Sequence, residues 1–334
     1  MRRCSSLLLA VLMVLTLCTG CGGRKERPEK TPKPTAEAVQ TPDFDPADVT
    51  PAMWKVTDAE GHTLYLFGTI HVGDGRSDAA MEKILPTVDS CDALALEFDL
   101  VEYETDVAAM MQTVETFTLP DDAEVTDTLP DELFERAKDL MDEAGVYNDG
   151  LLHFNVQFWS TLVDQCVMLV SSDLSSDHAM DSKLCEHAYD TELPVYSVES
   201  AQAQYDLINS VPDELAVAMI RDTLDSRDTY NDDLNEMYAL WLSGSTDELL
   251  AFIEDDEEPG PEEYSPELIA MAEDFDRAMG PERNKKMCAR ALEYLAGGKT
   301  VFFAVGAAHM LGEEGVVQLL TDAGCTVERY DYMA

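Results

Sequence analysis

Two short apolar segments, far apart in the chain, have the hydrophobic pattern of buried strands, and each ends in a glycine. Residues 64–67 lead into Gly68-Thr69-Ile70-His71, and residues 301–305 lead into Gly306-Ala307-Ala308-His309. Apolar runs of this length with aromatic and β-branched residues indicate buried strands, and glycine permits a sharp turn after them. We therefore expect His71 and His309 just beyond the carboxyl ends of two strands, where open α/β sheets bind ligands.

Two further apolar segments end in an acidic residue. Residues 93–96 precede Glu97, and residues 193–198 precede Glu199. Carboxylates are rarely buried unless they are paired or bind a metal, so four strand ends carrying His, Glu, Glu and His point toward a functional site. The alternative is that the glycines near His71 and His309 only make tight strand-to-helix turns, and spacing alone does not separate the two readings.

The middle of the chain has mostly the three- and four-residue apolar spacing of helices. The expected helices cover residues 77–88, 131–144, 151–170, 176–188, 213–224, 232–242, 246–253, 266–278, 281–295 and 313–323. The last of these would begin close after His309, with free amide groups that favour an anion. Strands at both ends and helices between them predict an α/β fold: a central mixed β-sheet covered by helices, with a helical insertion.

The amino terminus has the features of a secretory signal. Arg2 and Arg3 precede an apolar run at residues 7–17 that is too short for a comfortable membrane span. Cys21 follows Thr19-Gly20 as in a bacterial lipobox, which would make it the lipidated first residue of the mature protein; a plain cleaved signal is the alternative. Residues 24–51 contain six prolines and no aliphatic cluster, which is typical of a flexible spacer.

These features predict three parts. Residues 1–20 are expected to be a signal peptide, 21–51 a lipid anchor and disordered linker, and 52–334 an α/β domain. The domain would be tethered to the extracytoplasmic face of a bacterial cell membrane through its N-terminal lipid anchor.

Charge and cysteine content narrow the classes of partner. A formal net charge of −45 repels phosphate backbones, so we expect no nucleic-acid partner, and most of these charges are typical of a solvated acidic surface. The cysteines after Cys21 are odd in number and lack CxxC spacing, so neither a disulfide framework nor a thiolate zinc site is expected.

Four segments together resemble a known family. They are Tyr65-Leu66-Phe67-Gly68-Thr69-Ile70-His71-Val72-Gly73, Leu94-Ala95-Leu96-Glu97, Glu282-Arg283-Asn284 and Phe303-Ala304-Val305-Gly306-Ala307-Ala308-His309-Met310-Leu311-Gly312. Their order from residue 53 to 334 resembles the TraB/PrgY/GumN family, which is similar to the Tiki metalloproteases. Val198-Glu199-Ser200 with Gln204 resembles the family's central motif more weakly. The resemblance implies a fold like the erythromycin-esterase and ChaN group, with two related halves meeting at the site.

The resemblance also implies roles for individual residues. His71 and His309 would be metal ligands or bases, and Glu97 a ligand or the general base that deprotonates water. Arg283 and Asn284 would bind a substrate carboxylate or brace the site, although a helix-start ion pair and cap would also explain them. The metal would be manganese, cobalt or zinc, because no HExxH helix or complete zinc ligand set identifies it.

Three functions are therefore open at the level of sequence. The first is an extracytoplasmic metal-dependent hydrolase, most of all a peptidase, in which a cation activates water. The second is a metal-free, esterase-like hydrolase with His71 or His309 as general base. The third is a surface lipoprotein that binds a peptide or haem without turnover.

Overall fold

A six-stranded mixed β-sheet forms the centre of the molecule. The structure is a computed structural model that describes residues 44–254 and 264–332, and all structural statements concern these residues. The strand order is β4-β3-β5-β2-β1-β6. Strands β4, β3, β5 and β2 run parallel, and β1 and β6 pair antiparallel at one side. The strands are β1 (Met53–Thr57), β2 (Thr63–Thr69), β3 (Ala93–Leu96), β4 (Val195–Ser197), β5 (Val301–Gly306) and β6 (Thr326–Arg329).

The strands that precede the two histidines are direct neighbours. β2 and β5 pair in parallel, with Gly68 opposite Val305 and Thr69 opposite Gly306. All six residues of β5 are buried, which explains why its sequence is almost continuously apolar rather than alternating. The pairing brings the two Gly-x-x-His segments to the same edge of the sheet, although 238 positions separate them in sequence.

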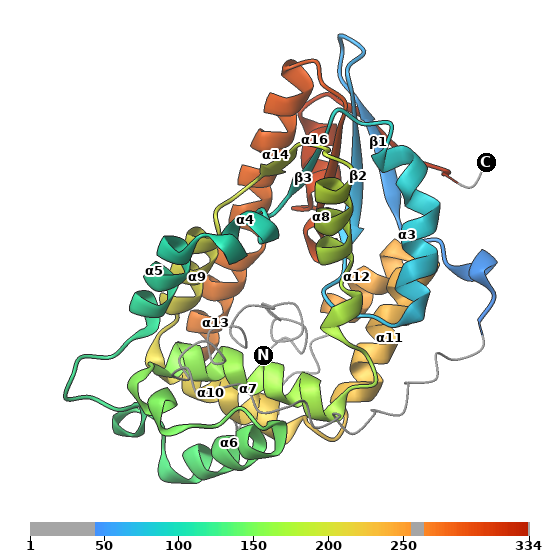
Figure 1. Cartoon of the computed structure of the whole chain (residues 1–334). Helices are drawn as coiled ribbons and strands as arrows, with labels where there is room; N and C mark the ends of the chain where they lie inside the picture. The colour runs from blue at the N-terminus through green and yellow to red at the C-terminus, as the bar shows by residue number, and fades with distance from the viewer. Residues whose placement is uncertain (1–43, 255–263, 333–334) are drawn as a thin grey trace, which may run out of the picture.

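Helices cover both faces of the sheet, and the α/β prediction is confirmed. Side chains on one face of the sheet, such as Leu66 and Phe303, pack with α14 (Pro281–Ala296) and α16 (Val316–Asp322). Side chains on the opposite face, such as Phe67 and Phe302, pack with α3 (Gly75–Val88) and α8 (Met180–Asp190). Figure 1 shows α3 and α14 on opposite sides of the sheet. This division follows from the two-residue repeat of a strand.

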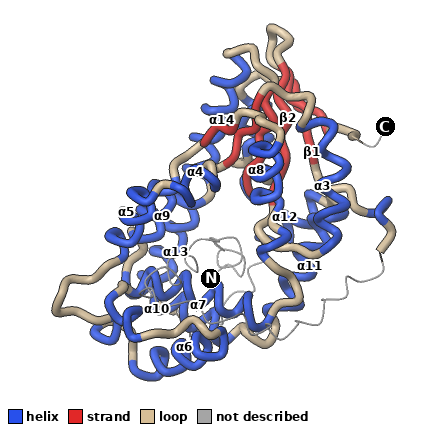
Figure 2. The backbone as a smooth tube through the Cα atoms, viewed as in Figure 1, coloured by secondary structure: helices blue, strands red, loops and turns tan. Residues whose placement is uncertain are grey.

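The remaining helices form the expected insertion, which extends away from the sheet (Figure 2). The α-helices are α4 (Leu100–Thr105), α5 (Val107–Phe117), α6 (Asp131–Ala144), α7 (Val156–Ser171), α9 (Ala201–Asn209), α10 (Asp213–Asp225), α11 (Tyr230–Ser243), α12 (Thr246–Glu254) and α13 (Pro266–Met279). Short 3-10 helices lie at η1 (Pro46–Asp48), η2 (Val125–Asp127), η3 (Asp149–His153) and η4 (Ser176–His178). Helix α7 is the centre of this part, because twelve of its residues are buried.

Three details of the secondary structure differ from the sequence prediction. The helix expected at residues 151–170 begins only at Val156, because Asn155 caps α7 by accepting from the amide of Phe158. Helix α9 was not expected, and its cap is the Ser200 hydroxyl. His309 does not precede a helix near residue 313: it lies within the one-turn helix α15 (Ala307–Met310), and α16 starts at Val316.

Part of the segment expected to be a spacer lies against the domain. Val49 is buried, and the amide of Thr50 donates to the carbonyl of Leu242 on α11. The signal peptide, Cys21 and most of the linker prediction lie outside the described residues. Within the described part of the chain, no helix combines the length and the apolar character needed to cross a membrane.

The five cysteines in the described part of the chain form no disulfide with one another. Four of the five are buried, and all five are free thiols: Cys91, Cys166, Cys185, Cys288 and Cys325.

The two histidine segments lie so close together that position 68 has no room for a side chain. A Cβ atom placed there would lie 2.8 Å from the Cα atom of Ala307, which is backbone and cannot move aside cheaply. We expect Gly68→Ala to lower the free energy of unfolding by about 1–3 kcal/mol in urea denaturation. Gly297→Ala is the control: its φ of −72° suits alanine, and we expect a change below about 1 kcal/mol. Equal losses in both variants would contradict this reading.

Candidate functional site

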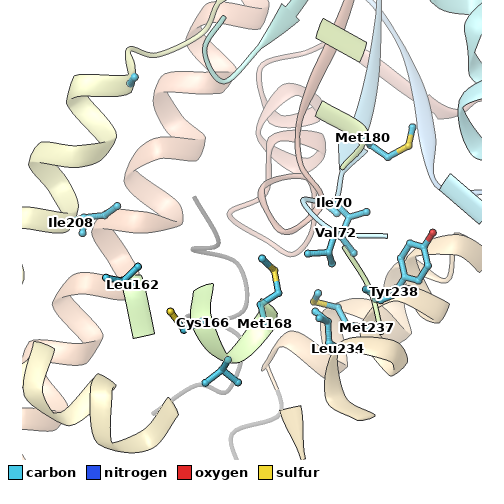
Figure 3. Close-up of a cluster of buried hydrophobic side chains, with 14 of the residues drawn as sticks. Ile70, Val72, Leu162, Cys166, Met168, Met180, Ile208, Leu234, Met237 and Tyr238 are labelled. Carbon is cyan, nitrogen blue, oxygen red and sulfur yellow. The ribbon is translucent and has the colours of Figure 1, made fainter. Parts of the chain in front are cut away.

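His71 sits on a segment held in place by its two neighbours. Ile70 and Val72 are buried in the cluster that links the sheet to α11 and α8 (Figure 3), with 6% and 3% of their surfaces exposed. The amide of Met180 donates to the carbonyl of Ile70, which ties the start of α8 to this segment. The next residue of α8 is Asp181, whose Oδ2 accepts from Nδ1 of His71 at 3.0 Å. The imidazole therefore presents its Nε2 atom to the site.

His309 is oriented by a different partner. Its Nδ1 atom lies 2.7 Å from Oδ1 of Asn284 on α14. The amide nitrogen of Asn284 donates to the carbonyl of Glu314, so the oxygen of that amide faces the ring and accepts from it. Nδ1 of His309 must then carry the proton, and Nε2 has a free lone pair when the ring is neutral.

Glu97 lies between the two imidazoles, at the end of β3. Its Oε1 accepts from the backbone amide of Gly306 at 2.9 Å and lies 3.9 Å from Nε2 of His309. Its Oε2 accepts from Arg283 at 2.6 Å and from the amide of Gln204 at 2.9 Å. The carboxylate is fixed by a neighbouring strand, by α14 and by α9.

Glu199 reaches the same site through Arg283. Nε and Nη2 of Arg283 donate to Oε2 of Glu199 at 3.0 and 2.8 Å, and Gln204 donates to it at 3.3 Å. The backbone continues the β3–β4 pairing, because the amide of Glu199 donates to the carbonyl of Glu97. Arg283 is 7% exposed, so one buried guanidinium bridges the two carboxylates.

Gly306 marks the point where the three side chains converge. A Cβ atom there would lie 3.3 Å from Oε1 of Glu97, 3.5 Å from Cδ2 of His309 and 4.0 Å from Nε2 of His71. The absence of a side chain at this position leaves the space between the carboxylate and the imidazoles open.

The two imidazoles differ in protonation. Burial acts to lower the pKa of His71, but the Asp181 carboxylate, with a smaller effect of Glu97, outweighs burial and raises that pKa to about 9. Burial, followed by the charge of Arg283, lowers the pKa of His309 to about 4. Near neutral pH, His71 is a cation and His309 is neutral in the metal-free protein.

Glu97 is ionised. Burial acts to raise its pKa, but the charge of Arg283 and then the two imidazoles outweigh burial and hold the pKa well below its ordinary value. The carboxylates of Glu97 and Glu199 raise the pKa of Arg283 in spite of its burial. Glu97 therefore acts as a negatively charged acceptor between Arg283, cationic His71 and neutral His309 near neutral pH.

The donor atoms suit a divalent cation in chemistry. Imidazole Nε2 atoms with the opposite nitrogen anchored, as in His71 and His309, are typical metal ligands, and carboxylates such as Glu97 complete such sites. Among residues 44–254 and 264–332, however, no three His, Cys, Asp or Glu side chains are already grouped to hold a metal ion. Oε1 of Glu97 accepts one hydrogen bond, from the amide of Gly306, so it keeps a lone pair with which it could serve as a third donor.

The structure brings together all six candidates that the sequence placed in the described domain: His71, Glu97, Glu199, Arg283, Asn284 and His309. Sequence reasoning missed Asp181 as a partner of His71. Gln204 was named as part of the weaker motif around Glu199, without a predicted role in the site. No spacing signal identifies either residue, and the clue available was chemical: an imidazole used for binding or proton transfer needs an acceptor for its other nitrogen.

The Asp181 contact predicts how His71 titrates. We expect Asp181→Asn to lower the pKa of His71 by about 1–3 pH units, because a buried imidazolium loses its counter-charge. An NMR titration of the histidine rings in chelator-treated protein measures this. Because the folded-state pKa of about 9 exceeds the ordinary histidine pKa of 6.5, the contribution of His71 to stability is present below pH 6.5 and is lost as the pH rises through 9. The variant should lose that dependence.

Asp177→Asn is the matched control, because Asp177 is exposed four positions before Asp181. A pKa of His71 that stays near 9 in Asp181→Asn would show that this carboxylate does not set the charge of the ring.

Comparisons with known proteins identify two curated relatives of the chain. The chain is 23% identical over 180 residues to Uncharacterized protein YbaP of Escherichia coli (strain K12), which covers 54% of this chain and 64% of YbaP. It is 23% identical over 179 residues to Uncharacterized protein YbaP of Shigella flexneri, with the same shares covered. The matched region thus spans less than two thirds of these curated relatives. No solved structure matches the chain.

The family model that matches is much broader in coverage. It extends over residues 52–329, which contain every candidate site residue except the proposed lipidation site, Cys21. The chain therefore belongs to the TraB/PrgY/gumN family.

Proposed function

We propose that this protein is a hydrolase whose site is formed by His71, Glu97 and His309, and that it cleaves peptides with the help of a divalent cation. One observation carries the proposal: two imidazoles, each anchored at Nδ1, converge with an ionised carboxylate beside a residue without a side chain. Such convergence leaves room for a reacting carbonyl and supplies groups that bind cations or move protons.

Nε2 of His71 and of His309 would hold the cation, with Glu97 as the third ligand or as the base beside it. Manganese, cobalt and zinc all suit imidazole and carboxylate donors. The chemistry that such a cation supplies is Lewis acidity, which lowers the pKa of water and polarises a carbonyl. Asp181 supports this assignment, because a carboxylate behind an imidazole fixes its tautomer and strengthens its basicity.

A second candidate is a metal-free, esterase-like hydrolase, and the opposite protonation of the imidazoles favours it. Neutral His309 can take a proton from water at Nε2, with Asn284 accepting from its Nδ1–H throughout. Cationic His71 can give its Nε2 proton to the leaving group. Pairs of titratable groups with pKa values pushed apart are the usual sign of such an acid and base.

The setting of the reaction is also a proposal. The signal-like first twenty residues and Cys21 support a lipid-anchored protein on the extracytoplasmic face of a bacterial membrane. The net charge of −45 supports a peptide or small-molecule substrate rather than nucleic acid.

Replacing Glu97 tests hydrolysis directly. We expect Glu97→Gln to lower kcat/KM about 10²- to 10⁴-fold against a mixed peptide library or a nitrophenyl ester, because the general base or ligand is lost. Circular dichroism checks that the variant folds. Glu104→Gln makes the same change on an exposed site of α4 and should leave the rate unchanged. Unchanged hydrolysis in Glu97→Gln would exclude this site, and tight peptide binding without turnover would favour a binding protein.

Metal titration separates the two hydrolytic mechanisms. We expect chelator-treated protein to bind Mn²⁺, Co²⁺ or Zn²⁺ at one site in calorimetry, and His71→Ala to weaken binding. Asp181→Asn should weaken metal binding about 10- to 100-fold, because Asp181 holds the ring of His71 through its Nδ1 atom. His153→Ala, on an exposed residue, is the control. Full hydrolytic activity after chelation, without site-specific binding, would select the metal-free mechanism.

A further inference from the structure

A small pocket lies in the helical part of the molecule, between α7, α9, α10 and α13. Its cavity volume is about 20 Å³, and it is partly open to solvent. Ile208, Met219 and Phe275 supply apolar walls, while α7 supplies a polar wall. In Figure 1, α7 and α10 lie at the end of the molecule away from the sheet, so this pocket is separate from the candidate hydrolytic site.

The polar wall is built from one face of α7. Ser160, Thr161 and Asp164 line the pocket, and Asp164 lies four positions after Ser160 and three after Thr161, which places it beside both on the helix surface. The Thr161 hydroxyl donates to the carbonyl of Gln157, so its oxygen remains able to accept a hydrogen bond. The wall thus offers carboxylate and hydroxyl oxygens to one ligand.

Asp164 has no hydrogen-bonding partner. It is 6% exposed, and both of its carboxylate oxygens are buried without a hydrogen bond. Buried carboxylates ordinarily have a partner, as Glu97 has in Arg283. Within the described residues that line the pocket, Asp164 is the sole ionisable side chain.

The surroundings of Asp164 favour a cation. Tyr230 on α11 is the ionisable group that interacts with it electrostatically, and a phenol supplies no positive charge. Burial raises the pKa of Asp164 to about 8, so the empty pocket holds a carboxylic acid near neutral pH. A bound cation would convert this acid into a carboxylate and relieve the missing interaction.

The volume and lining restrict the kind of cation. A cavity needs roughly 10–15 Å³ to hold one water molecule, so 20 Å³ accommodates a head group of about that size. A primary ammonium is of this size and has three N–H donors for a carboxylate and hydroxyls. Divalent cations such as Ca²⁺ carry two charges and take six to eight oxygen ligands at about 2.3–2.6 Å, whereas Asp164 is the one ionisable side chain among the described residues of the lining.

We propose that this pocket binds the protonated amino group of a small primary amine, with Asp164 as its counter-ion and the apolar walls against its short hydrocarbon chain. The ammonium donates to Asp164 and to the hydroxyls of Ser160 and Thr161. Near neutral pH the carboxylic acid of Asp164 gives its proton to solvent when the ammonium enters, so each amine bound releases close to one proton. The assignment is independent of the hydrolytic site.

Calorimetry of the full chain with n-butylammonium chloride at pH 6.5 tests the proposal. We expect saturable binding at one site. Its heat should differ between two buffers of different ionisation enthalpy by the amount that release of nearly one proton requires. Asp164→Asn, which keeps the shape and removes the charge, should weaken binding about tenfold or more. Asp139→Asn makes the same change on an exposed position of α6 and should have no effect.

Further probes and a second variant exclude trivial outcomes. Neutral n-butanol should bind at least tenfold more weakly than n-butylammonium. Met219→Trp should block the pocket while leaving Asp164 in place. This second variant tests the site even if Asp164→Asn fails to fold. Binding that is absent in the wild type, or equal in Asp164→Asn, would overturn the proposal. Equal binding of NH₄⁺ or K⁺ would also overturn it, because the site would then be one for a simple monovalent ion.

Discussion

The buried guanidinium of Arg283 is the interaction on which the site depends. It lies between the carboxylates of Glu97 and Glu199, which end the neighbouring strands β3 and β4 and would repel each other without it. Removing one member of a buried ionic group costs about 3–5 kcal/mol, because the remaining charges keep their desolvation penalty without their partner. The register of β3 with β4, and the position of α14 beside them, are therefore coupled to the charges at the sheet edge.

The same charge arrangement makes two similar motifs chemically different. Both histidines follow a strand and a glycine, and both are held through Nδ1. His71 contacts the carboxylate of Asp181, which outweighs burial and raises its pKa to about 9. His309 contacts the neutral amide of Asn284, and burial, followed by the charge of Arg283, lowers its pKa to about 4. The duplicated pattern in the sequence therefore yields an imidazolium and a neutral imidazole, and not two copies of one function.

The parts of the site that lie on strand ends could be predicted from apolar runs in the sequence. Arg283 and Asn284 on α14 were indicated by the family resemblance alone, and Asp181 on α8 was not indicated at all. An apolar run followed by Gly-x-x-His or by Glu fixes both the strand and the residue at its end. Asp181 reaches His71 only because α8 packs against the sheet in one rotation, and Gln204 lies on α9, a helix that the apolar spacing did not indicate. The one-turn helix around His309 is too short to leave a periodic signal.

Glu97 and Asp164 show how one chain treats buried acids in opposite ways. Glu97 is buried among a guanidinium, two imidazoles and a backbone amide, and its pKa is lowered. Asp164 is buried among apolar side chains and hydroxyls, and its pKa is raised to about 8. The first group is stabilised as an anion by the protein itself, so it resists protonation and keeps its negative charge without further help. The second becomes an anion only when something from outside supplies the positive charge, and that dependence on a partner is the property that distinguishes a binding pocket from a defect in the core.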